Sequence, residues 1–324
     1  MSACAKAAQW RVAVNFLAQL ICTCMQPDVV GWSSVMTACV RRDEWALALT
    51  LLWLGKRRGL ELDVICYNVA ITACEKCHSW VWALRILHEM SLCVVKPSAV
   101  TYRASIFVCM RTQQWEQSCR LLQDATQLDR SVESCNATMS ACERASAWQL
   151  ALQIFGDWQA RQTPWQNHAL DATSYTLVAS ACGRGTQWSA ALWLLRHAEK
   201  ERQPLDIIAY SAVISACGRG GSWSIAVSLL MEVLLQQLRV DTAAFNAAIS
   251  ACEMAGPPQW EVALALLQQM EAHRLQPNIT SFNSAMNTCT KAAVWHAALE
   301  LLGNLHASPV EVDVVFFSAA LGVC

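Results

Sequence analysis

The sequence predicts an all-α fold, an α-solenoid (superhelix) of stacked helical hairpins. Ten cysteines recur at near-constant intervals from Cys4 to Cys324, and a tryptophan follows nine of them. The common period is 35 residues, with excursions to 33, 37 and 40, and the step from Cys to Trp is six residues in every unit but the one that ends at Trp260. A fixed period of this length is typical of an array whose units contact only their neighbours.

Each unit has the pattern of two amphipathic helices. When a unit is numbered so that its Cys is position 11, its Trp is position 17. In the unit 64–98, Tyr67, Ile71 and Cys74 fall at positions 4, 8 and 11, which is one apolar stripe on a first helix, helix A. Trp80 opens the same kind of stripe on a second helix, helix B. We expect the Cys and the Trp to be core residues without a catalytic role.

Breaker residues separate these helices. The connector between helices A and B contains glycines such as Gly185 and Gly220, which tolerate the positive φ of a helix C-terminal cap, and prolines such as Pro97 follow helix B. The predicted boundaries are a partial repeat at 1–28, eight complete repeats at 29–63, 64–98, 99–131, 132–171, 172–206, 207–241, 242–278 and 279–313, and a truncated repeat at 314–324.

Composition narrows the class of protein. The apolar content is 55%, yet no run of 18 apolar residues occurs, so we expect no membrane span. Repeat cysteines should lie too far apart for neighbours to form disulfides, which favours a reducing compartment for the seventeen cysteines. Met1 already stands inside a repeat, so we expect no signal or transit peptide here and regard both ends of the chain as cut.

Catalytic and cofactor signals are weak. The run from Cys74 to His78 spells a haem-attachment pattern, but Cys74 is the repeat cysteine and other units lack the run. Cys22 and Cys24 have no second pair at zinc spacing. No glycine-rich phosphate loop or Ser/His/Asp set stands out. We therefore expect no enzyme activity, cofactor, metal or small-molecule substrate.

The units resemble the pentatricopeptide repeat (PPR). The resemblance rests on the run 64–74 with Tyr67 and Asn68, on the Ala and Leu pattern of helix B, and on the run 280–283 after Pro277. It covers the whole chain, and the superhelix is expected to be right-handed. The tetratricopeptide repeat, a protein-binding array, is the alternative, but its Trp, Leu-Gly and Tyr pattern belongs to the first helix, whereas Trp here begins the second.

The resemblance implies a partner, single-stranded RNA, with one base read by each repeat. In the family, position 5 and the last position of a unit read the base edge and position 2 packs on its face. Carried over, the reading pairs are Ser33 with Asp63, Asn68 with Ser98, Arg103 with Ser131, Asn136 with Asp171, Thr176 with Asp206, Ser211 with Asp241, Asn246 with Asn278, and Asn283 with Asp313. The stacking residues are Val30, Ile65, Val100 and Ile208, and Val315 holds the same position in the truncated unit.

Two of these positions hold residues that depart from the family's pattern. Arg103 is too long for the usual edge contact, and Glu133, at position 2, would lie badly against a polyanion. By the family's preferences, Thr176 with Asp206 favours guanine and the Asn with Asp pairs favour uracil. Asn68 with Ser98 and Asn246 with Asn278 resemble readers of pyrimidines that lean toward cytosine. The tract expected from the resemblance is similar to 5′-G-C-N-U-G-G-Y-U-3′. The alternative is that residues such as Asp63 only cap the helix that follows.

The distribution of charge also bears on whether the chain binds nucleic acid. The formal net charge is −1, which argues against strong non-specific nucleic-acid binding. Position 13 is nevertheless basic in most units, at Arg41, Lys76, Arg111, Arg144, Arg184, Arg219 and Lys291. One cation per repeat could follow one phosphate per nucleotide, or could merely complement the helix dipole.

The function expected from the sequence is an RNA-binding adaptor without catalysis. The resemblance implies a role in organelle RNA processing, stability or translation, in a chloroplast or mitochondrion, and other RNA-processing proteins as further partners. A protein-binding scaffold that holds a peptide on the same surface is the alternative.

Overall fold

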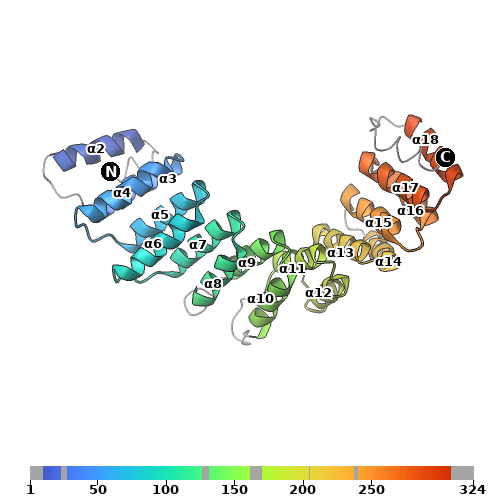
Figure 1. Cartoon of the computed structure of the whole chain (residues 1–324), viewed down its shortest axis with the longest axis horizontal. Helices are drawn as coiled ribbons and strands as arrows, with labels where there is room; N and C mark the ends of the chain where they lie inside the picture. Colours follow the sequence, from blue (N-terminus) through green and yellow to red (C-terminus); the bar gives the residue numbers. More distant parts are fainter. Residues whose placement is uncertain are drawn as a thin grey trace. The chain divides into compact units, whose positions relative to one another are not determined.

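The fold is built from helices alone. The computed structural model describes residues 10–22, 28–125, 131–160, 170–203, 205–236 and 240–307. Within these residues the chain forms seventeen α-helices, α2 to α18, and no β-strand (Figure 1). None of these helices is long and apolar enough to cross a membrane. The chain divides into two compact units, residues 1–145 and 146–324.

The helices alternate between two classes. The A helices are α3 (Val29–Arg41), α5 (Val64–Lys76), α7 (Ala99–Arg111), α9 (Val132–Arg144), α11 (Ala172–Arg184), α13 (Ile207–Arg219), α15 (Thr242–Met254) and α17 (Ile279–Lys291). The B helices are α2 (Trp10–Cys22), α4 (Trp45–Arg57), α6 (Trp80–Leu92), α8 (Trp115–Ala125), α10 (Trp148–Ala160), α12 (Trp188–Lys200), α14 (Trp223–Leu235), α16 (Trp260–Ala272) and α18 (Trp295–Ala307).

Consecutive hairpins stack in the same way within each unit. In the first unit, helix α5 packs against its own partner α6, against the A helices α3 and α7, and against the preceding B helix α4. In the second unit, α13 packs against α14, α11, α15 and α12 in the corresponding way. Within each unit the A helices therefore form one layer, and the B helices pack against it. The prediction of an all-α solenoid of stacked hairpins is confirmed.

Side-chain caps fix where the A helices begin. The Oδ1 atom of Asp63, in extended backbone, accepts a hydrogen bond of 2.9 Å from the backbone N–H of Cys66. This cap satisfies an amide that would otherwise have no partner in the first turn. The same cap occurs at Ser98, Ser131, Asp171, Asp206, Asp241 and Asn278.

The repeat cysteines are buried, as predicted. Their side chains have no solvent-exposed surface in any of the eight repeats, at Cys39, Cys74, Cys109, Cys142, Cys182, Cys217, Cys252 and Cys289. Burial raises the pKa of Cys74 and Cys109 to about 12 and that of Cys182 and Cys252 to about 11. These thiols stay protonated at neutral pH and pack as small apolar groups.

The repeat tryptophans are less buried than predicted. Those that begin α6, α8, α10, α12, α14 and α16 are half-buried, and Trp45 and Trp295 are exposed. The indole does lie between hairpins, because a Cβ atom added to Gly185 would come within 2.1 Å of Cδ1 of Trp148. Its other side faces solvent. A glycine is therefore needed at position 185 to leave room for the indole of Trp148. The residue with positive φ in this connector is Thr186 and not the expected Gly185.

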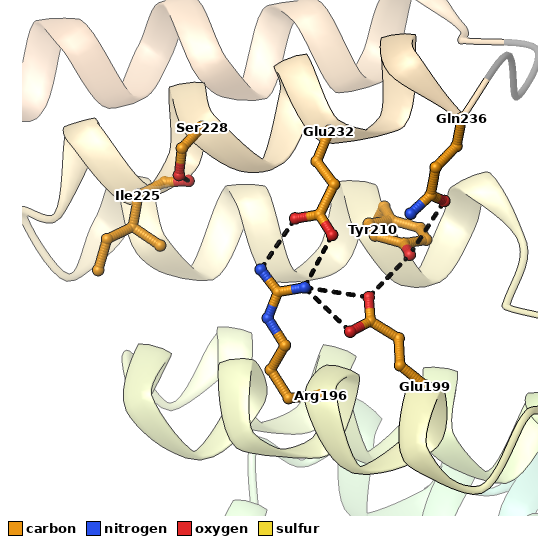
Figure 2. A network of polar contacts seen from close by, with 7 residues as sticks. All are labelled: Arg196, Glu199, Tyr210, Ile225, Ser228, Glu232 and Gln236. Atoms are coloured by element: carbon orange, nitrogen blue, oxygen red, sulfur yellow. Dashed lines mark hydrogen bonds and ion pairs between the residues drawn. The ribbon is translucent and has the colours of Figure 1, made fainter.

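Polar contacts also join successive repeats on the B side. Arg196 of α12 makes two hydrogen bonds of 2.8 Å to the carboxylate of Glu232 of α14 (Figure 2). The same guanidinium pairs with Glu199, which accepts a 3.1 Å hydrogen bond from the hydroxyl of Tyr210 on α13. Hydrogen bonds from Arg196 lower the pKa of Glu232. The network ties three helices from two repeats.

Candidate nucleic-acid interface

The predicted site residues at positions 2, 5 and 13 share one face of their own A helix. Positions 2, 5, 9 and 13 are three or four residues apart, so they share a helix face. In the second unit this face forms a groove of about 470 Å³. Its lining is Ser180 and Arg184 of α11, Ile208, Ser211, Ala212, Ser215 and Arg219 of α13, and Ala243 and Ala247 of α15. The groove thus brings together one stacking residue, one reading residue and two basic residues of those predicted.

The predicted stacking residues are apolar and exposed. The exposed fraction is 63% for Val30, 58% for Ile65, 49% for Val100 and 60% for Ile208. These side chains stand in the first turns of α3, α5, α7 and α13. A recurring exposed aliphatic group is available to pack on a flat apolar surface such as a base. Val315 lies outside the described residues.

Two of the reading pairs are joined by hydrogen bonds. The Nδ2 atom of Asn246 donates to Oδ1 of Asn278 at 3.2 Å. Asn68 is linked to Ser98 through Thr101, whose Oγ1 donates to Asn68 Oδ1 at 2.6 Å and lies 3.0 Å from the Ser98 hydroxyl. The last residue of each of these units therefore lies beside position 5, while it also caps the helix that follows.

The hydroxyl residues at position 5 bond to their own helix. Ser33 donates to the carbonyl of Val30 at 3.0 Å, and its side chain is buried. Thr176 donates to the carbonyl of Ala172 at 2.9 Å. Ser211 donates to the carbonyl of Ile208 at 2.9 Å, in an exposed setting. Because the proton is engaged, each hydroxyl oxygen can serve a further partner only as an acceptor.

The other residues at position 5 differ in their burial and in their polar partners. Nη1 of Arg103 forms an ion pair of 3.3 Å with Oε2 of Glu133, at position 2 of the next repeat. Asn136 is half-buried on α9. Oδ1 of Asn283 is buried without a hydrogen-bond partner among the described residues. Its pair residue, Asp313, lies outside the described residues.

The basic residues of position 13 end the A helices, where they complement the helix dipole. Three of them also form ion pairs with the preceding repeat: Lys76 with Asp43 at 2.9 Å, Arg111 with Glu75 at 2.8 Å, and Lys291 with Glu253 at 3.1 Å. Arg184 and Arg219 line the groove beside Ser211. The column is therefore structural at several repeats and faces the groove at two.

Position 9 is a site that the sequence reasoning missed. Ser180 and Ser215 line the groove and add hydroxyl groups between the reading and basic positions. A signal was present, since position 9 also holds Thr37, Thr72, Ser140, Ser250 and Asn287, polar residues four positions after position 5. Their place on the groove face follows from helical spacing alone.

Residues able to hold a metal do not cluster. Across the parts of the chain that the structure describes, no group of three or more His, Cys, Asp or Glu side chains could bind an ion. In the haem-like run, Cys74 is buried and the Cys77 thiol donates to the Cys74 carbonyl at 3.4 Å.

Comparisons with known proteins point to one family. The pentatricopeptide repeat domain matches residues 50–111 and 228–292, and the PPR repeat matches residues 208–236. No curated protein matches the chain in sequence.

Solved structures show the same kind of fold. The fold is similar to the crystal structure of the pentatricopeptide repeat protein PPR10 from maize, with a TM-score of 0.58 and 19% identity over 97% of this chain and 48% of that chain. It is also similar to PPR10 in complex with an 18-nucleotide psaJ RNA element, with a TM-score of 0.54 and 16% identity over 100% of this chain and 51% of that chain. The chain spans about half the length of these structures.

Proposed function

The chain belongs to the pentatricopeptide repeat family, and from this premise we propose that it is a single-stranded RNA-binding adaptor that reads one base per repeat and catalyses no reaction. Several observations support the proposal. In the repeats 29–63, 64–98 and 207–241, the A helix carries an apolar, a polar and a basic residue at positions 2, 5 and 13, which share one helix face. The chain also has the fold of a protein that was crystallised with RNA.

The groove on α11, α13 and α15 is the observation that carries this proposal. Ile208 offers an exposed apolar surface to a base, Ser211 an acceptor oxygen to its edge, and Arg184 and Arg219 positive charge to the backbone. Stacking, edge recognition and phosphate contact are the three elements of single-strand recognition. A groove that combines them suits a nucleotide chain better than an apolar peptide.

The strength of the reading assignments differs between repeats. In the pair Asn246 and Asn278, the two side chains already hold each other in a defined orientation, which favours a fixed preference at that base. Ser33 is buried and bonded to its own helix, so it has less access to a base. The proposed role in organelle RNA processing, stability or translation rests on the family resemblance.

The test is binding of purified protein to randomised single-stranded RNA, followed by salt titration of the enriched sequence. Reversal of two groove charges, Arg184→Glu with Arg219→Glu, should weaken binding at least tenfold. The slope of log K against log salt should fall by about 1.4, since each phosphate contact contributes roughly 0.7 for a single strand.

A matched control separates position from net charge. Arg57→Glu with Arg58→Glu changes the charge by the same amount at the exposed end of the B helix α4. Binding by this control should change far less. Equal losses in the two double variants would refute the groove as the binding surface. Failure to enrich any RNA would refute the proposed function and favour the protein-binding alternative.

A further inference from the structure

A second cysteine stands at the interface between the repeats 99–131 and 132–171. Position 21 of helix B is Leu or Val in seven repeats: Leu49, Leu84, Leu152, Leu192, Val227, Leu264 and Leu299. In the repeat 99–131 it is Cys119. This residue lies on α8, which packs against α9 of the next repeat, where Cys142 is the repeat cysteine. The substitution therefore places a second sulfur at a site where every other repeat has an aliphatic side chain.

The two sulfur atoms are in contact. The distance from Cys119 Sγ to Cys142 Sγ is 3.9 Å. Cys142 has no exposed surface, whereas Cys119 is half-buried and has access to solvent. Beside this pair, the buried hydroxyl of Ser118 donates to Thr138 Oγ1 at 3.2 Å. The hydrogen bond fixes the register of α8 on α9, so the two thiols are held opposite each other.

The environment makes the two thiols unequal. The hydrogen bond between the two thiols lowers the pKa of Cys119, against the opposing effects of burial and of the Glu116 carboxylate. The pKa of Cys142 is raised by the same contact and by burial. Burial alone raises the pKa of Cys109 and Cys135 to about 12. Cys119, which solvent can reach and whose pKa is the lower of the two, is suited to attack a peroxide, and the buried Cys142 is suited to act as the resolving thiol.

We propose that Cys119 and Cys142 form a peroxide-sensitive pair that closes to a disulfide between two successive repeats. The Cys119 thiolate attacks one oxygen of a hydroperoxide, the O–O bond breaks, and a sulfenic acid forms on Cys119. The Cys142 sulfur then attacks the Cys119 sulfur, the S–O bond breaks, and water leaves. In sum, two thiols and one hydrogen peroxide give one disulfide and two water molecules. A dithiol reductant reverses the reaction by exchange.

The disulfide would tie α8 to α9. The sulfur atoms must approach from 3.9 Å to about 2 Å, a movement shared between two side chains. Repeat arrays open at the interfaces between neighbouring units, and a covalent bond across one interface suppresses that opening. The pair therefore acts as a redox clamp at one junction of the array, independently of whether the chain binds RNA.

Mass spectrometry tests the proposal directly. The reduced protein is treated with hydrogen peroxide, remaining thiols are blocked, and non-reducing peptide maps are recorded. We expect a peptide that joins Cys119 to Cys142, with a loss of about 2 Da that dithiothreitol reverses. Cys119→Leu, which restores the side chain of the other repeats and so should fold, must abolish it. Cys93→Ser, at an exposed cysteine, must leave it unchanged.

Hydrogen exchange tests the clamp. Amides of α8 and α9 should exchange more slowly after oxidation in the native protein and at an unchanged rate in Cys119→Leu. Oxygen added at Cys119 without a cross-link would overturn the proposal. So would a cross-link that forms without slowing exchange in these two helices, or a loss of about 2 Da that persists in Cys119→Leu.

Discussion

The ion pair between Arg103 and Glu133 gives a sharp test of where RNA runs. These residues occupy a reading position and a stacking position of adjacent repeats, and they are 39% and 67% exposed. Arg103→Gln removes a positive charge and leaves Glu133 unpaired, whereas Glu133→Gln removes the negative charge. If RNA follows this face, the first variant should bind it more weakly and the second more tightly. The double variant should bind close to the native level.

The magnitude follows from Coulomb's law. One unit charge about 4 to 8 Å from a phosphate in water contributes roughly 0.5 to 1 kcal/mol, which is about a two- to five-fold change in dissociation constant. An exposed pair contributes only about 0.2 to 1 kcal/mol to folding, so each variant should remain folded. Fluorescence anisotropy with labelled RNA at fixed low salt measures the affinity, and a thermal melt confirms the fold.

The control is Glu116→Gln, which removes an exposed carboxylate from the first turn of the B helix α8. It changes the net charge as Glu133→Gln does, but away from the A layer. Its effect on affinity should be well under two-fold, because salt screens charges beyond about 10 Å. If Arg103→Gln and Glu133→Gln change affinity in the same direction, or if neither differs from Glu116→Gln, RNA does not pass this site.

Three further predictions concern the code, the packing and pH. Thr176→Asn makes an Asn with Asp pair, so selection on random RNA should show guanine replaced by uracil at one nucleotide. Gly185→Ala should destabilise the protein by about 1 to 3 kcal/mol in urea titration, because the added Cβ atom meets Trp148 at 2.1 Å. Glu232→Gln should lower stability by about 0.2 to 1 kcal/mol at pH 7. Since Arg196 depresses the pKa of Glu232, its stabilisation is complete above the unfolded value near 4.3 and disappears as pH falls through the folded value.

Each of these predictions has its own control. A selected sequence that Thr176→Asn leaves unchanged would contradict base reading at that repeat. Gly156→Ala, where no atom lies within 4 Å of the added Cβ, should instead stabilise helix α10 by about 0.5 to 1 kcal/mol. For the ion pair, stability is measured by urea titration from pH 3 to 7; a difference between Glu232→Gln and native protein that grows toward acid pH would contradict the assigned sign.

The helical frame could be predicted because every repeat restates the same local signals. The cap at Asp63, the apolar stripe through Tyr67 and Cys74, and Trp80 at the start of helix B are each set by near neighbours in sequence. The exposure of the tryptophan could not be predicted in this way. It depends on the connector of the next repeat, as the close approach of Trp148 to Gly185 shows.

The sequence predicted which positions of each repeat form the candidate site. It did not predict the hydrogen-bond partner of each side chain at those positions. Thr176 and Asn246 have equivalent places on their helices, yet the first bonds to its own backbone and the second to Asn278 and Thr280. Which partner is chosen depends on side-chain length and on the residue that caps the following helix. A prediction based on position alone therefore assigns Thr176 and Asn246 the same hydrogen-bonding role.

At two repeats, a glutamate at position 12 is the partner of the cation at position 13 of the next repeat. Where position 12 is Glu75 or Glu253, the cation that follows in the next repeat forms an ion pair with it. Where position 12 is Gly183, no carboxylate is supplied there, and a guanidinium nitrogen of Arg219 lies 3.2 Å from the place that a Cβ atom would take. Arg219 then lines the groove beside Ser211. A carboxylate at position 12 is therefore one source of a partner for the next cation, and it is not the only one, because Lys76 pairs with Asp43, at position 15.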